Sequence, residues 1–132
     1  MIKKVEHVAI IVKNIEKSIQ YYSDMFGFTL RKTGKNSRRE MAFLKLDNHP
    51  GFEIELILDI IPQGDYADKG IVNHLAFTVD NIQEAIQYYR GKGIVFHSVE
   101  PNNAFDGAKT IFFNGPNGEL LQFVEPVVSL HP

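Results

Sequence analysis

Two stretches of the chain change from alternating apolar positions to a helical period at an asparagine. They cover residues 7–22 and 74–89. In each, apolar residues rich in Val and Ile alternate before the asparagine, which is typical of a strand buried on one side. After Asn14 and Asn81 the apolar residues recur at helical spacing, and both asparagines are suited to cap a helix N-terminus. Each stretch therefore predicts a strand followed by a helix.

The two stretches are copies of one another. Residues 7–22 align without gaps onto residues 74–89 at an offset of 67, and nine of the sixteen positions are identical. Two unrelated amphipathic segments would match at hydrophobic positions, but we would not expect them also to share His, Asn, Gln and both tyrosines. The chain is thus predicted to contain one βα unit twice.

Further strand-like stretches follow each predicted helix, and Gly27 and Gly93 are expected to end the helices. The predicted strands are residues 29–32, 41–46 and 52–60 in the first copy, and residues 94–99, 110–114 and 120–124 in the second. We therefore predict an α+β fold built from two βαβββ modules in tandem. The modules cover about residues 1–64 and about residues 70–132 of a single domain, and the Pro-, Gly- and Asp-containing segment 62–69 is interpreted as their connector.

Strand alternation predicts on which sheet face each leading histidine lies. Because neighbouring residues of a strand point to opposite faces, His7 shares a face with Ala9, and His74 shares a face with Ala76. The opposite face of each strand is fully apolar and should pack on the helix. The small alanines leave space for a cavity beside each histidine.

The same offset pairs two polar residues in the last strand of each copy, Glu55 and Gln122. Each stands between apolar neighbours. A buried polar group without a partner costs about 1–3 kcal/mol, so an interior glutamate needs a compensating contact. A metal ion would supply one. Together with the two histidines, these positions predict a metal-binding site.

Composition limits what kind of site this is. With 132 residues, 44% of them hydrophobic, the chain is long enough for one core without disulfides. It has no cysteine, so a metal must be bound by nitrogen and oxygen atoms. The 14 basic and 16 acidic residues are mixed, which argues against nucleic acid or a membrane surface as partner. The apolar run of residues 8–12 is too short for a signal core or a membrane span, and a cytoplasmic location is expected.

The pattern resembles the vicinal oxygen chelate superfamily, which includes glyoxalase I, methylmalonyl-CoA epimerase, extradiol dioxygenases and antibiotic-resistance proteins. The resemblance covers nearly the whole chain and rests on the two histidine-led strands, on Met25-Phe-Gly-Phe28 and on the turn Asn114-Gly-Pro-Asn-Gly118. It implies paired modules that form a curved, partly closed mixed sheet around a cup. It also implies one divalent metal ion per site, Zn, Ni, Co or Mn. Carried onto this sequence, the metal ligands are His7, Glu55, His74 and Gln122.

The activity that the resemblance implies is that of a glyoxalase I-like lyase or isomerase. A carboxylate removes a proton next to a carbonyl, and the metal stabilises the enediolate. Glu55 would be both ligand and base, because Gln122 stands where glyoxalase I usually has a glutamate. The expected substrate is a small oxygenated compound, either a thiol adduct or a CoA thioester. A homodimer is expected from the family.

Two alternatives stay open. A methylmalonyl-CoA epimerase-like isomerase also pairs one amide ligand with one carboxylate, and it needs a second base, for which Glu40 is the candidate. A non-catalytic ligand-binding protein of the resistance type is favoured by the amide of Gln122. Where many glutathione-using members have an arginine and an asparagine, this chain has Ile11 and Asp59, which argues against glutathione as the cosubstrate.

Overall fold

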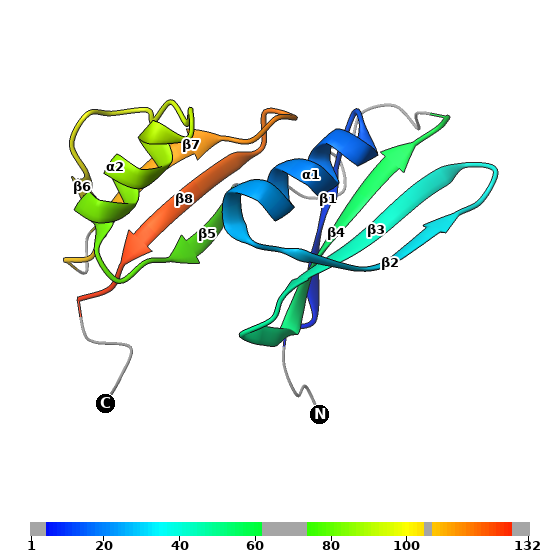
Figure 1. Cartoon of the computed structure of the whole chain (residues 1–132), viewed down its shortest axis with the longest axis horizontal. Coiled ribbons are helices and arrows are strands. Elements are labelled where there is room, and N and C mark those ends of the chain that lie inside the picture. Colours follow the sequence, from blue (N-terminus) through cyan, green and yellow to red (C-terminus); the bar gives the residue numbers. More distant parts are fainter. Residues whose placement is uncertain (1–4, 62–73, 105–106, 128–132) are drawn as a thin grey trace. The chain divides into compact units, whose positions relative to one another are not determined.

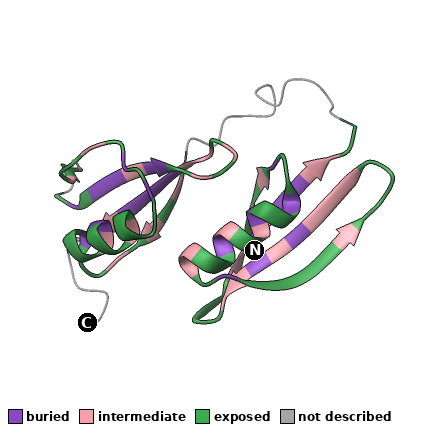
Figure 2. Ribbon diagram, turned by 45° about the horizontal axis from the view of Figure 1, so that its top comes forward, coloured by how far each residue is buried: buried purple, intermediate pink, exposed green. Residues whose placement is uncertain are grey.

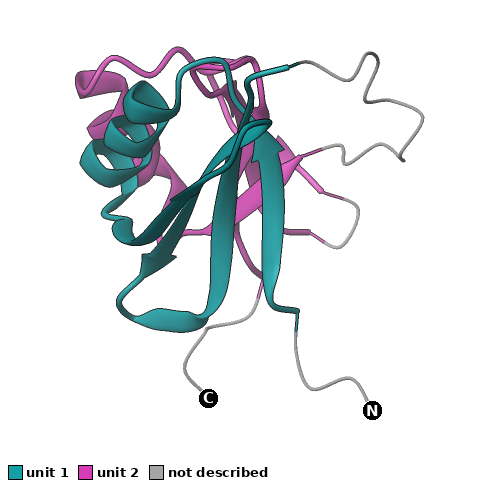
Figure 3. Cartoon of the chain, turned by 90° about the vertical axis from the view of Figure 1, so that its right-hand side faces the viewer, with its two compact units in different colours: residues 1–70 teal, residues 71–132 magenta. Residues whose placement is uncertain are grey.

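A computed structural model of the chain describes residues 5–61, 74–104 and 107–127. The chain divides into two compact units, unit 1 of residues 1–70 and unit 2 of residues 71–132 (Figure 3). The segment interpreted as a connector, residues 62–69, lies outside the described residues. Among the described helices, none is long and apolar enough to cross a membrane.

Unit 1 is a four-stranded mixed sheet with one helix packed across it (Figure 1). The sheet order is β1-β4-β3-β2; β1 runs parallel to β4, and the other pairs are antiparallel. In chain order the elements are β1 (His7–Ile11), α1 (Ile15–Phe26), β2 (Thr29–Lys35), β3 (Arg39–Leu46) and β4 (His49–Asp59).

Unit 2 repeats this topology in the sheet order β5-β8-β7-β6, again with its first strand parallel to its last. Its elements are β5 (Leu75–Thr78), α2 (Ile82–Gly91), β6 (Asn102–Asn103), β7 (Lys109–Asn114) and β8 (Leu120–Glu125). The predicted α+β fold of two βαβββ modules is therefore confirmed. Each module has its own open sheet, and a cup formed by the two together stays a prediction.

Local sequence signals explain where the helices begin and end. The side chain of Asn14 accepts a hydrogen bond from the backbone N–H of Lys17 at 3.0 Å, and Asn81 accepts one from Glu84 at 3.1 Å. Both caps satisfy N–H groups that have no partner within the helix. Gly27 ends α1 in the left-handed conformation, with φ 80°. Gly93 ends α2 as predicted: it follows the C-cap Lys92 with φ 98°, and the N–H groups of Gly93 and Ile94 donate to the carbonyls of Arg90 and Tyr89.

The core of each unit lies between its helix and its sheet. In unit 1 the alternate residues Ala42, Leu44, Ile54 and Leu56 are at most 1% exposed, and in α1 Tyr22 is fully buried (Figure 2). The equivalent positions of unit 2 are more aromatic, and its most buried side chains include Ile86, Ile111, Phe113, Leu121 and Phe123. One face of each sheet is thus covered by its helix, which leaves the opposite face for the polar residues.

The predicted strand at residues 94–99 is wrong. Its alternation is real, because Phe96 is 9% exposed while Val95 is 84% exposed. However, the segment pairs with β7 only at one isolated bridge, from Phe96 to Phe113. The hydroxyl of Ser98 then donates to the carbonyl of Glu100 in a local turn, and regular pairing resumes only at β6. The alternation of apolar residues correctly predicts which side chains of this segment are buried. It does not predict where the backbone pairs with the edge of the sheet, and that pairing decides where a strand forms.

Candidate metal-binding residues

His7 and Glu55 meet on the sheet face that points away from α1. In the parallel pairing of β1 with β4, Ala9 lies opposite Glu55, and the buried Ile54 lies opposite Val8 on the other face. His7 Nε2 is 3.6 Å from Glu55 Oε1, and the two side chains are 39% and 14% exposed. The alternation inferred from the sequence is therefore correct for this strand, and the first two candidate ligands lie together.

The donor atoms of this pair are suited to one divalent ion. Bonds from zinc to imidazole nitrogen or carboxylate oxygen are about 2.0–2.2 Å, so one ion can bridge two donor atoms up to about 4 Å apart. The 3.6 Å between His7 Nε2 and Glu55 Oε1 lies within that span. His7 Nδ1 lies 3.2 Å from Glu6 Oε1. A carboxylate at Nδ1 favours the tautomer whose Nε2 lone pair points toward Glu55.

Glu53 shares this sheet face but has a different partner. Its carboxylate accepts from Arg31 Nε at 2.5 Å and from Arg31 Nη2 at 2.9 Å. The Arg31 guanidinium holds the pKa of Glu53 below its ordinary value, with smaller contributions from His7 and Lys45. Glu53 is thus held as an ion-paired carboxylate, whereas Glu55 faces His7.

Unit 2 presents its two candidate ligands at matching positions. Ala76 lies opposite Gln122 in the parallel pairing of β5 with β8, just as Ala9 lies opposite Glu55 in unit 1. Gln122 is buried to 9% exposure, and Phe112 lies opposite it on β7. His74 comes one residue before β5, and its ring packs edge-on against Phe112 at 5.3 Å. His74 and Gln122 therefore both lie beside Phe112.

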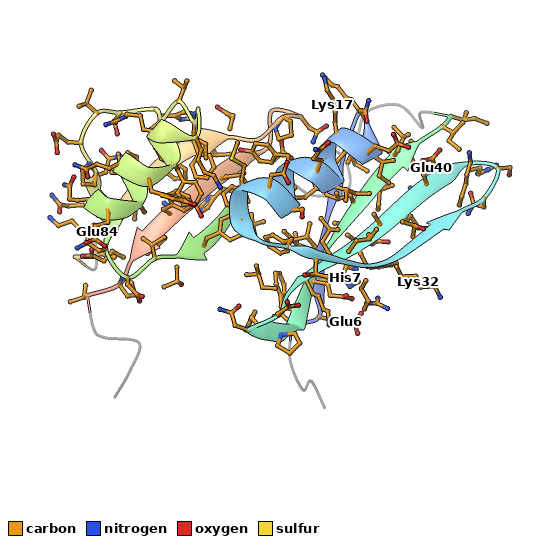
Figure 4. The ribbon with its side chains drawn as sticks, viewed as in Figure 1. Glu6, His7, Lys17, Lys32, Glu40 and Glu84 are labelled. Carbon is orange, nitrogen blue, oxygen red and sulfur yellow. The ribbon has the colours of Figure 1, made fainter. Side chains whose placement is uncertain are left out.

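Glu40 is not with these residues. It stands on β3 two residues before Ala42 and four before Leu44, both buried under α1, so it lies on the helix side of the sheet. Its Oε1 is 3.3 Å from Lys35 Nζ. Figure 4 shows Glu40 apart from His7. Among the described residues the candidate ligands lie as one pair in each unit, and no group of three or more His, Asp or Glu side chains is placed to hold a metal ion.

Sequence reasoning missed Arg31 and Glu6. A β-bulge between Leu30 and Lys32 shifts the register of β2, and Arg31 reaches across Phe43, 5.0 Å from its ring centroid, to Glu53. Such a contact depends on strand register, which spacing along the chain does not report. Glu6 had one available signal, its position next to His7.

Comparison with known proteins agrees with the fold described above. The model of the Glyoxalase/Bleomycin resistance protein/Dioxygenase superfamily matches residues 4–123. The uncharacterized protein YwbC of Bacillus subtilis is 30% identical over 127 residues, which are 95% of this chain and 99% of that protein. Lactoylglutathione lyase of Schizosaccharomyces pombe is 29% identical over 116 residues, covering 70% of this chain and 38% of that enzyme.

A solved structure gives the same result in three dimensions. The glyoxalase family protein from Enterococcus faecalis superposes with a TM-score of 0.76 at 27% identity, covering 93% of this chain and 98% of that chain. The family model spans both units, and the resemblance inferred from the sequence is confirmed. The chain belongs to the Glyoxalase/Bleomycin resistance protein/Dioxygenase superfamily.

Proposed function

We propose that this chain is a metal-dependent lyase or isomerase of the glyoxalase I type, which removes a proton next to a carbonyl. The observation that carries the proposal is the 3.6 Å approach of His7 Nε2 to Glu55 Oε1 on the open face of the unit 1 sheet. The matching register of Gln122 in unit 2 supports it. The similarity to lactoylglutathione lyase over 70% of the chain is consistent with this reaction class.

The residues that would hold the metal are His7, Glu55, His74 and Gln122. Two imidazoles, a carboxylate and an amide oxygen suit a borderline divalent ion such as Zn, Ni, Co or Mn. When bound, the ion supplies Lewis-acid stabilisation of the negative charge that develops on the substrate oxygens.

Glu55 is the proton acceptor in this proposal. Its side chain is 14% exposed, so little water competes for the carboxylate, and it carries the ionisable group that Gln122 lacks. Glu6 would orient His7 through Nδ1 so that Nε2 keeps its lone pair for the ion. We give Glu40 no role, because it lies on the opposite face of the sheet, paired with Lys35.

Non-catalytic ligand binding is the second candidate, and Gln122 is the observation that favours it. An amide, 9% exposed, occupies the position that matches Glu55, so among the four proposed ligands only unit 1 offers a carboxylate for proton transfer. A protein of this kind would bind its ligand tightly without converting it. An epimerase-like reaction needs a second base, and the position of Glu40 gives that alternative no support.

The test is turnover with and without metal. Protein reconstituted with each of the four metals is assayed with hemithioacetals of methylglyoxal and several thiols, and with methylmalonyl-CoA. We expect conversion of at least one hemithioacetal, loss of activity with a chelator and recovery when metal is returned. Metal binding without conversion of any substrate would favour the non-catalytic candidate, and conversion of methylmalonyl-CoA alone would favour the epimerase.

A further inference from the structure

We propose that Arg31, supported by Lys32 and Lys45, binds a carboxylate of the substrate beside the proposed metal ligands. The substrate class is then a compact thiol adduct that carries a carboxylate a few bonds from its reacting carbonyl. This inference rests on the proposed function, because it takes His7 and Glu55 as the reacting end of the site.

The Arg31 guanidinium is held in place before any ligand binds. The Glu53 carboxylate accepts hydrogen bonds from both Nε and Nη2 of Arg31, which makes a two-point contact. The guanidinium also lies over the Phe43 ring, 5.0 Å from its centroid. Nη1 takes no part in that two-point contact, and the side chain is 45% exposed. A fixed guanidinium matches a planar carboxylate with less ordering cost than a mobile one. Arg31 thus has both the rigidity and the remaining donors that carboxylate binding requires.

Two further cations lie on the same sheet face. The bulge in β2 brings Lys32 opposite Phe43, directly after Arg31, so that two consecutive basic residues share one face. Lys45 lies opposite Glu53 on β3 and contributes to the low pKa of that carboxyl group. Glu53 offsets one of these three charges, and the carboxylate of Glu6, beside His7, also attracts Arg31. The β2–β3 side of the face therefore favours an anion.

The register sets the distance from this cluster to the proposed reacting end. Arg31 starts on β2 but reaches Glu53 on β4, and Glu53 lies directly opposite His7 on β1. Neighbouring strands are about 4.8 Å apart, so the guanidinium lies within roughly one or two strand spacings of the His7 side chain. A substrate that spans both groups must be short, which favours a small carboxylate thiol over a long one.

The experiment compares two thiols of the same length that differ in charge. Metal-loaded full-length protein is assayed with the methylglyoxal hemithioacetals of 3-mercaptopropionate and of 3-mercaptopropionamide. We expect kcat/KM to favour the carboxylate about tenfold or more, mainly through KM, because one charge-assisted hydrogen bond contributes that much. Arg31→Met should remove the preference, because kcat/KM for the carboxylate thiol falls to about the value for the amide.

Two variants serve as controls. Arg90→Met removes an arginine that lies over a phenylalanine ring in unit 2, at 5.8 Å from Phe96, and it should keep the full preference. Arg31→Met together with Glu53→Gln avoids an unpaired carboxylate, and it should lose the preference as Arg31→Met does. If both thiols react equally with the wild type, or if Arg31→Met slows both by the same factor, the inference is wrong while the proposed function stands.

A binding measurement distinguishes a failure of this inference from a failure of the proposed function. Backbone amide shifts of the full chain are followed while 3-mercaptopropionate or its amide is added at constant ionic strength. Carboxylate-dependent shifts on β2 to β4 that disappear in Arg31→Met support the inference even if no hemithioacetal is converted. The same shifts with both compounds, or no shifts with either, would overturn it.

Discussion

Units 1 and 2 hold their candidate ligands at the same register but surround them with different groups. In unit 1 the face that carries His7 and Glu55 also has the Arg31–Glu53 ion pair and the Arg39–Asp59 ion pair, in which Arg39 Nε is 2.8 Å from Asp59 Oδ1. The same face of unit 2 is formed around Gln122 by Phe112 and the buried Thr110. The first face is charged and the second is neutral.

The two units share the backbone geometry of this site but differ in the side-chain groups that they place there. The pairing of Ala9 with Glu55 recurs as the pairing of Ala76 with Gln122, so the backbone frame was kept while the side chain changed. Proton transfer needs an ionisable group, and among the proposed ligands only unit 1 has a carboxylate. In our account unit 1 supplies the base and the substrate anchor, and unit 2 supplies neutral metal donors.

The largest effect is expected from removing the aromatic core of unit 2. Phe123 is 1% exposed and packs against Phe113 at 4.7 Å and Tyr89 at 5.0 Å. Phe123→Ala should lower the free energy of unfolding by about 3–5 kcal/mol through lost burial and the cavity left behind. Denaturant titration measures this change, with the exposed Val95→Ala as control. A loss below 1 kcal/mol would show that the unit 2 core is not arranged as described.

Exchanging the two last-strand ligands tests the asymmetry itself. Glu55→Gln makes unit 1 resemble unit 2, and it should lower kcat by about a hundredfold or more because the base is lost. Gln122→Glu makes unit 2 resemble unit 1 and should keep metal and activity. Both are measured with the hemithioacetal that the wild type converts best. Equal activity of Glu55→Gln and wild type would show that Glu55 is not the base.

A smaller effect is expected at Glu6. Its carboxylate lies 3.2 Å from His7 Nδ1, and groups that orient metal-bound histidines typically change metal affinity by 10- to 100-fold. Because Glu6 is exposed, we expect Glu6→Gln to weaken metal affinity by about tenfold at most, measured by competition with a chromogenic chelator. Glu84→Gln, at the start of α2, is the matched control and should leave affinity unchanged. Identical metal affinities of Glu6→Gln and wild type would show that Glu6 does not orient His7 for metal binding.

The smallest effect concerns pH and the Arg31–Glu53 ion pair. Because the pair lowers the pKa of Glu53 in the folded protein, its stabilisation is present above the ordinary pKa of 4.5 and is lost as pH falls through the lowered value. Wild type should therefore exceed Arg31→Met in stability at neutral pH, and the gap should shrink below pH 4.5. Urea titrations between pH 3 and 7 measure it. Arg90→Met should show no such trend, and a gap that grows in acid would contradict the assigned sign.

Features that depend on neighbouring residues could be predicted from the sequence. The caps Asn14 and Asn81, the duplicated topology and the face of His7 all follow from short-range spacing. Glu40 could also have been assigned to the helix side, because it alternates in phase with Ala42 and Leu44.

Features that depend on pairing between distant strands could not be predicted. The segment 94–99 has a strand pattern, but a strand forms only where a partner edge is available, and here pairing shifted to β6. The approach of Arg31 to Glu53 needs the β2 bulge, which has no clear signal in the sequence. The register between strands is set only when the sheet forms, so the spacing of residues along the chain does not predict it.

Metal stoichiometry tests the central claim most directly. Elemental analysis of the reconstituted wild type should find about one divalent ion per proposed site, and both His7→Ala and His74→Ala should lose it, because each unit donates one imidazole. His49→Ala, at the exposed start of β4, should keep the full amount. Metal retained by both His7→Ala and His74→Ala, or no metal in the wild type, would contradict the claim that the duplicated histidines form the site.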